Sequence, residues 1–136
     1  MSLQYDESQL IKAGGGVLLL SKYKRERPSE EILNKAIERL RVAFPYQQNE
    51  FFVLLRERLI VNMFCDERLR VACDTIIDHY NYKTLTIANI IEYDETIQLY
   101  TKSQRIELQN TASMARRKVP EFSSIVIGNS EYFIMR

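Results

Sequence analysis

Apolar residues recur at helical spacing near the middle of the chain. From Ile32 to Ala43 they fall at steps of one, three or four, which is the pattern of one helix face. Ser29 supplies a capping hydroxyl before this stripe, and two acids follow it in the first turn, where the helix dipole favours them. Pro45 cannot continue the helix. The pattern therefore predicts a helix that starts after Ser29 and ends just before Pro45.

Further helices are predicted downstream. The segment from about Asn49 to Phe64 has a broad apolar face, wide enough for the centre of a bundle. The clearest pattern follows Asp66, the expected N-cap, because apolar residues fall at i, i+3, i+4, i+7, i+8 and i+11 from Leu69 to Tyr80. Thr86 is expected to cap a fourth helix that carries Ile87, Ile90 and Ile91, followed by a bend near Asp94 and a further helix that includes Ile97, Leu99 and Tyr100.

The N-terminal region has a weaker pattern. Residues 3–13 favour a short helix, and Val17–Leu20 favours a buried turn or another short helix. Gly14–Gly16 lies between them and breaks the helix, because three glycines cost roughly 3 kcal/mol relative to alanine in a helix. We therefore expect the glycines to form a hinge or a helix break, followed by a basic linker that ends at Pro28.

The C-terminal region changes character. The polar residues 102–118 predict a partly exposed helix or an arm. From Ser124 to Met135, β-branched and aromatic residues flank Gly128 and Asn129, which is typical of a β-hairpin. The whole pattern predicts an all-α fold, a four- to six-helix bundle with a small C-terminal β-hairpin. The predicted single helical domain, 1–136, comprises an N-terminal helix and basic linker (1–28), a helical core (29–101), a polar helix or arm (102–122) and a hairpin (123–136).

The composition is typical of a soluble globular protein, with 46% hydrophobic and 27% charged residues. Lys and Arg number 19 against 18 Asp and Glu, so the net charge is only +1 and strong sequence-independent DNA affinity is not expected. No segment approaches the ~18 apolar residues that span a bilayer. Cys65 and Cys73 do not form the framework of a disulfide-stapled protein, so a cytoplasmic protein is expected.

No constellation in the sequence predicts a catalytic, metal or cofactor site. The glycine triplet lacks the Gly-Lys pair of a phosphate-binding loop. His79 has no good metal ligand three or four residues away, and it is expected to be a surface or capping residue. Cys73 lies on an apolar helix stripe and is expected to be a buried thiol. An enzyme is therefore not predicted.

Two groups of basic residues are less neutralised by neighbouring acids than the others. Arg68, in contrast, lies beside Asp66 and Glu67 and is expected on a solvated helix face. The candidates for phosphate contact are Lys22, Lys24, Arg25, Arg27, Arg116, Arg117 and Lys118. Tyrosines could lie at the edges of the core or form a surface for a protein partner, and the candidates for partner contact are Tyr82, Tyr93, Tyr100 and Tyr132.

The order of the parts from residue 32 to residue 100 resembles a known family. The residues that carry the resemblance are Ala43-Phe44-Pro45, Asp66-Glu67-Arg68-Leu69, Ala72, Ile76-Ile77, Tyr82, Thr86-Ile87-Ala88 and Tyr93-Asp94. They resemble the small helical domains of phage and prophage replication proteins, in particular the helicase loader/inhibitor family, and uncharacterised proteins of mobile elements. Lys83-Thr84 stand where this family has prolines, and Asn89 replaces its usual acid. The C-terminal hairpin stands where the helicase loader has a flexible, helicase-engaging region.

The resemblance implies a non-enzymatic accessory or adaptor protein of a phage or mobile element that acts through protein contacts. DNA replication is the implied process, and a replicative helicase or initiator is the implied partner. One alternative is a DNA-binding domain that uses the two basic groups. Another is a purely structural, self-associating module, a homodimer in which the C-terminal hairpin pairs with that of a second copy. No membrane contact is expected.

Overall fold

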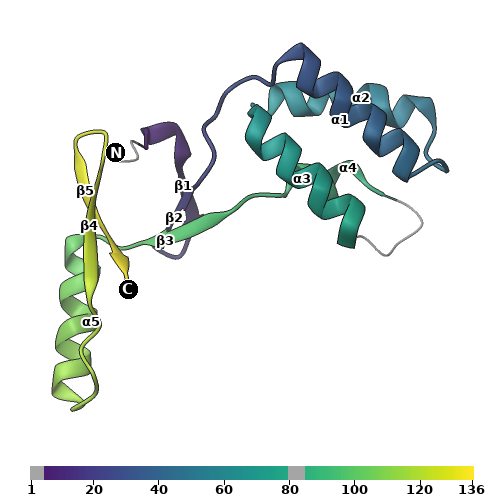
Figure 1. The fold of residues 1–136 in the computed structure, drawn as a ribbon. Helices are drawn as coiled ribbons and strands as arrows, with labels where there is room; N and C mark the ends of the chain where they lie inside the picture. Colours follow the sequence, from purple (N-terminus) through teal and green to yellow (C-terminus); the bar gives the residue numbers. More distant parts are fainter. Residues whose placement is uncertain (1–4, 80–84) are drawn as a thin grey trace. The chain divides into compact units, whose positions relative to one another are not determined.

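The computed structural model describes residues 5–79 and 85–136. Figure 1 shows the path of the chain through five α-helices and five β-strands in these ranges. The helices are α1 (Glu30–Ala43), α2 (Asn49–Val61), α3 (Asp66–His79), α4 (Ile87–Ile91) and α5 (Lys102–Met114). The strands are β1 (Leu10–Gly14), β2 (Val17–Ser21), β3 (Thr96–Leu99), β4 (Phe122–Ile127) and β5 (Ser130–Met135), and a short 3₁₀ helix, η1 (Glu7–Gln9), precedes β1.

The prediction of an all-α bundle with only a small hairpin is wrong, because the fold is mixed α/β. Strands β1, β2 and β3 form an antiparallel sheet in that order, and β4 and β5 form a second, two-stranded antiparallel sheet. The C-terminal hairpin itself is confirmed, with Ile127 paired to Ser130 across the turn at Gly128 and Asn129.

The chain divides into two compact units, each with its own core. The helical unit, Tyr23–Asp94, contains α1 to α4. The sheet unit contains the residues on both sides of it, up to Lys22 and from Glu95 onward, and thus β1 to β3, α5 and the hairpin. In sequence, the helical unit is therefore an insertion between two paired strands, β2 and β3.

The helical unit follows the predicted stripes closely. Ser29 caps α1 by accepting a hydrogen bond from the backbone of Ile32. Thr86 caps α4, and Asn89 completes a capping box because its side chain accepts a hydrogen bond from the Thr86 backbone at 3.2 Å. The fully or nearly fully buried core consists of Leu33, Ala36, Ile37, Leu40, Phe44, Phe52, Leu55, Leu59, Phe64, Leu69, Ala72, Cys73, Ile76, Leu85 and Ile90.

Two charged residues of α3 have roles other than those predicted. Asp66 is the first residue of the helix, and its carboxylate accepts a hydrogen bond from the Ser29 backbone at 2.7 Å, which joins the starts of α1 and α3. Arg68 is only 5% exposed, so its predicted place on a solvated face is wrong. Position 68 lies one helical turn before Ala72, at the edge of the buried stripe.

Arg68 joins α3 to the last residues of the helical unit. Its guanidinium donates to the carbonyl of Tyr93 at 2.8 Å and to that of Ile91 at 3.3 Å, and it lies 3.9 Å from the ring centre of Phe64. Asp94 lies 3.8 Å from the same guanidinium, and burial lowers the pKa of Arg68 while this carboxylate opposes the change. Asp94 also pairs with Arg25 at 3.4 Å. The first and last segments of the helical unit therefore meet at one partly buried, charged cluster.

In the sheet unit, the N-terminal prediction is wrong. Residues 3–13 were expected to form a helix and Val17–Leu20 a turn or short helix, but β1 and β2 form a hairpin that pairs Gly14 with Val17. Gly15 and Gly16 form the turn of this hairpin and Gly14 ends β1, so the triplet breaks no helix. All three glycines have positive φ, between +60° and +86°, which side chains with a Cβ rarely adopt.

The further helix expected at Ile97, Leu99 and Tyr100 is also wrong. Thr96 to Leu99 is strand β3, in which Ile97 and Leu99 face inward and the two polar residues are exposed. Its partner β2 is far away in sequence, with Ser21 opposite Thr96. The pairing extends to Lys22, whose N–H donates to the carbonyl of Glu95 at 2.8 Å.

The polar segment that was expected to be a helix or an arm is the helix α5. Thr101 caps it, and Gln104 closes a capping box and donates to the carbonyl of Gly16 at 3.0 Å. Figure 1 shows α5 beside the β4–β5 hairpin. A second core, built around Leu20, Leu99 and Ile127, joins the hairpin to the three-stranded sheet.

We predict that the helical unit folds without the sheet unit, because its core and its charged cluster are internal to residues 23–94. A fragment of these residues should unfold cooperatively, with the circular dichroism spectrum of a helical protein. A chain in which a short turn joins Lys22 to Glu95 should retain the sheet unit. A fragment that lacks helical structure, at a concentration where the full chain is folded, would contradict this division.

We predict that Arg68→Ala lowers the free energy of unfolding by about 3 kcal/mol, because it removes the two hydrogen bonds to the carbonyls of Ile91 and Tyr93 and one of the cations beside Asp94. Arg70→Ala is the matched control, since Arg70 is exposed on the same helix, and its effect should lie within about 0.5 kcal/mol of zero. Urea unfolding of the two variants measures the difference. Equal losses would show that Arg68 does not stabilise the helical unit.

Candidate docking groove on the helical unit

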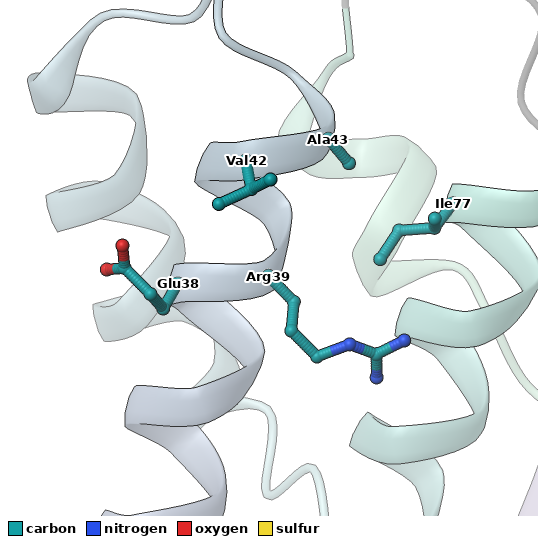
Figure 2. Close-up of a pocket in the computed structure, with 5 residues that line it drawn as sticks. All are labelled: Glu38, Arg39, Val42, Ala43 and Ile77. Atoms are coloured by element: carbon teal, nitrogen blue, oxygen red, sulfur yellow. The ribbon is translucent and has the colours of Figure 1, made fainter.

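An open groove of about 460 Å³ lies between α1 and α3. Glu38, Arg39, Val42 and Ala43 line it from α1, and Ile77 lines it from α3 (Figure 2). We call it the α1–α3 groove. Its lining is mostly apolar, which is typical of a binding surface.

The helical repeat arranges the α1 side of the groove in two rows. Glu38 and Val42 are four residues apart and stack in one row, and Arg39 and Ala43 stack in the next. In Figure 2, Ile77 extends from α3 toward α1. Val42 and Ile77 therefore supply apolar contacts from both helices, with Ala43 leaving room between them.

The two charged side chains of the groove differ in their partners. Arg39 pairs with Asp74 of α3 at 2.5 Å, so its charge is compensated and it ties the two helices together. Glu38 is exposed and makes no ion pair with another residue in the described part of the chain. The groove consequently offers apolar contacts beside one uncompensated negative charge.

Two apolar side chains in and just after α1 are highly exposed. Val42 is 75% exposed, and Tyr46, in the loop after α1, is 85% exposed. Scattered exposed apolar residues are normal on any protein surface. Val42, however, lines the groove itself, so its exposed side chain belongs to a surface suited to a partner.

Cys73 lies in the middle of α3, one helical turn before Ile77, and it is completely buried. Burial raises the pKa of its thiol to about 11, while Arg39 acts in the opposite direction and Asp74 adds to the rise. The thiol therefore stays protonated near neutral pH and behaves as an apolar packing group, as predicted.

The seven basic residues predicted to contact phosphate are divided between the two units. Lys24, Arg25 and Arg27 belong to the helical unit, and Lys22 belongs to the sheet unit. Arg25 is committed to Asp94, and Lys22 lies 4.0 Å from Glu95. Lys24 and Arg27 are exposed.

The second basic group, Arg116–Lys118, follows the end of α5 in the sheet unit and is exposed. The N–H groups of Arg116 and Arg117 donate to carbonyls of the last turn of α5, Ser113 and Ala112. Positive charges at this end of a helix are stabilised by its dipole. These residues therefore have a structural role in ending α5, besides their exposure to solvent.

The tyrosines predicted to contact a partner are mostly packed. Tyr93 packs against the helical core, and Tyr132 packs against the core of the sheet unit. The ring of Tyr100 packs edge-on against Phe122, with ring centres 5.5 Å apart. Tyr82 lies outside the described residues. The most exposed tyrosine of the described chain regions is instead Tyr46, which the sequence interpretation did not select.

The other groove residues were also missed, although the sequence contained a signal for one of them. Val42 falls outside the apolar stripe from Ile32 to Ala43, so it cannot face the same core. An apolar residue off the stripe, close to an aromatic residue in the next loop, predicts an exposed apolar surface. Ile77 gave no such signal because it belongs to the buried-side pattern of α3.

Within residues 5–79 and 85–136, no cluster of three or more His, Cys, Asp or Glu side chains has a geometry suited to a metal ion. Over the same ranges, no helix combines the length and the apolar character needed to cross a membrane.

Comparison of the chain with models of protein families, with curated proteins and with solved structures gave no match.

We predict that the buried Cys73 thiol makes the stability depend on alkaline pH. In the unfolded chain the thiol loses its proton near its ordinary pKa of 9.0, whereas in the folded protein it keeps the proton until about 11. Its contribution is fully present below pH 9 and is lost as the pH rises through 11, a change of roughly 2–3 kcal/mol in the free energy of unfolding.

The control is Cys73→Ala, which removes the titration of this thiol and leaves the other groups that titrate at alkaline pH unchanged. Urea unfolding between pH 8 and 11 should show a shallower fall in stability for Cys73→Ala than for the original chain. The slopes are compared, not the absolute stabilities, because the alanine also leaves a small cavity. Parallel slopes would contradict the burial of the thiol.

Proposed function

We propose that the chain is a non-enzymatic accessory protein that acts through protein contacts, with the α1–α3 groove as its docking site. The observation that carries this proposal is the groove itself, an apolar surface formed by Val42 and Ala43, which are exposed, and Ile77, which is partly buried at the edge of the core. A groove between two helices suits a third helix, whose apolar side chains lie at intervals of three and four residues. The occupant we propose is therefore one amphipathic helix of a partner protein.

The charges of the groove specify this helix further. Arg39 is neutralised by Asp74, whereas Glu38 makes no ion pair within the described ranges. A lysine or arginine at the edge of the partner helix would compensate Glu38, and an acidic residue there would be repelled. The proposed ligand is thus a helix with apolar anchors and a basic flank.

The proposed partner is a replicative helicase or initiator, and the proposed setting is DNA replication in a phage or mobile element, in the cytoplasm. The support is the resemblance of residues 32–100 to small helical domains of phage replication proteins. Residues 32–94 of that stretch belong to the helical unit, and Thr86 caps α4 within it. The two cysteines are free and buried, which agrees with a reducing compartment.

The DNA-binding alternative stays a prediction. Of its seven residues, Arg25 is held by Asp94, and Lys22 lies near Glu95. Lys24, Arg27 and the group Arg116–Lys118 are the exposed cations on which it now depends. Its signature would be DNA affinity that falls steeply with salt concentration.

We predict that Val42→Glu weakens binding of the partner by about tenfold or more, because it buries a charge at the centre of the interface. Val42 is highly exposed, so the substitution should leave the fold intact. Val53→Glu is the matched control, since it introduces the same charge at an exposed valine of α2 that does not line the groove.

The measurement has two steps. Affinity capture from a host lysate should enrich a replicative helicase or initiator with the original chain and with Val53→Glu, but not with Val42→Glu. Titration calorimetry with the captured protein then gives the affinities. Absence of any replication protein would remove the replication setting, and equal capture by both glutamate variants would contradict the groove as the docking site.

A further inference from the structure

Strand β4 forms an outer edge of the sheet unit with unpaired backbone groups. In the neighbouring strand β5, Phe133 exchanges both of its backbone hydrogen bonds with Tyr100, each 2.8 Å long. The N–H and C=O of Phe133 therefore point away from β4. In the β4–β5 ladder Phe133 lies opposite Ser124, so the N–H and C=O of Ser124 must point away from β5.

In an antiparallel ladder, residues whose backbone groups bond to the neighbouring strand alternate with residues whose backbone groups point away from it. Phe122, Ser124 and Val126 all have outward N–H and C=O groups, while the residues between them bond to β5. The hydrogen bond from Arg136 N–H to the carbonyl of Glu121, 2.9 Å long, fits the same phase. No residue that the structure describes provides a backbone partner for Ser124 or Val126 on this edge.

The opposite edge of this unit, strand β1, differs from β4 because it is protected against pairing with another chain. Strand β1 carries the exposed Lys12, and its pairing with β2 is irregular between Lys12 and Gly14. Charges and irregularities of this kind prevent an edge from pairing with another chain. β4 has neither, because it contains no charged residue from Phe122 to Ile127 and pairs regularly over its whole length.

We propose that the outer edge of β4 pairs antiparallel with β4 of a second copy of this chain, around a two-fold axis at Ser124. This pairing places Ser124 opposite its own copy and Phe122 opposite Val126. Pairs of hydroxyl residues and of an aromatic with a β-branched residue both stabilise neighbouring strands. The outward N–H and C=O groups of one copy thus lie opposite the C=O and N–H groups of the other.

The charge pattern and the symmetry favour a second copy as the occupant. No charge on β4 opposes a like charge in the paired strand. A two-fold pairing also uses the edge of both copies, so assembly stops at a dimer and does not continue as a fibre. Because a single pair of strands buries little area, the dissociation constant is expected between about 1 µM and 1 mM.

The proposed dimer uses only the sheet unit and does not involve the α1–α3 groove. Sedimentation equilibrium of the full chain, at concentrations up to about 1 mM, should show a monomer–dimer equilibrium. Ser124→Pro should weaken the dimer at least tenfold, because proline removes an outward N–H while the bonds to β5 remain. Ser124→Ala is the matched control: it also removes the hydroxyl that donates to Glu131, but it keeps the N–H and should still dimerise.

A second variant guards against a folding defect in Ser124→Pro. Val126 is 62% exposed, so Val126→Lys should retain the fold, checked by circular dichroism, and should also abolish the dimer by charging the edge. Hydrogen exchange supplies a residue-level readout, since the amides of Ser124 and Val126 should become protected as concentration rises. A chain that is monomeric throughout, or a dimer that survives in both Ser124→Pro and Val126→Lys, overturns the proposal.

Discussion

The architecture depends on the antiparallel pairing of β2 with β3. Ser21 lies opposite Thr96, and the next bond, from Lys22 N–H to the Glu95 carbonyl, closes the pair at 2.8 Å. The segment between Lys22 and Glu95, which is the helical unit, must therefore have its first and last residues close together in space. The helical unit meets this constraint internally, because Arg68 and Arg25 both lie close to Asp94, its last residue. A salt-bridged cluster thus joins the two ends of the insertion, while strand pairing joins the residues on either side of it.

An insertion of this kind separates the tasks of the two units. Each has its own core, so a change on the surface of one is not expected to disturb the packing of the other. The helical unit presents a groove between α1 and α3, and the sheet unit presents the unpaired edge of β4. A groove receives side chains, whereas a strand edge bonds to backbone, so the two surfaces suit partners of different geometry.

The helices between residues 29 and 91 could be predicted because their signals are local. Caps at Ser29 and Thr86 and the 3.6-residue repeat act within one segment, and the structure has the same caps. The strands of the sheet unit could not be predicted in the same way. A short apolar run such as Val17–Leu20 suits a strand or a helix, and only its distant partner β3 decides between them. The alternation of Thr96–Leu99 was the available signal, but four residues are too few to be decisive.

The candidate sites also combine features that the sequence predicts with features that depend on the tertiary structure. Val42 could be recognised as an exposed apolar residue because it leaves the stripe of α1, whereas its proximity to Ile77 depends on how α1 and α3 pack. The burial of Arg68 could not be predicted either, because a charge beside acids usually stays in solvent. The carbonyls of Ile91 and Tyr93 and the carboxylate of Asp94 make its burial favourable, and these contacts depend on the tertiary structure. The free edge of β4 required a tertiary contact, the bond pair between Tyr100 and Phe133.

Nuclear Overhauser contacts between α-protons test the central pairing most directly. In an antiparallel ladder, the pairs without mutual hydrogen bonds have Cα atoms about 4.5 Å apart, which gives strong contacts between their α-protons. The bond at Lys22 and Glu95 sets the phase, so these pairs are Ser21 with Thr96 and Leu19 with Gln98. Strong contacts in both pairs are the expected result. Their absence, together with helical contacts between residues three apart from Thr96 to Tyr100, would contradict the insertion of a helical unit between two paired strands.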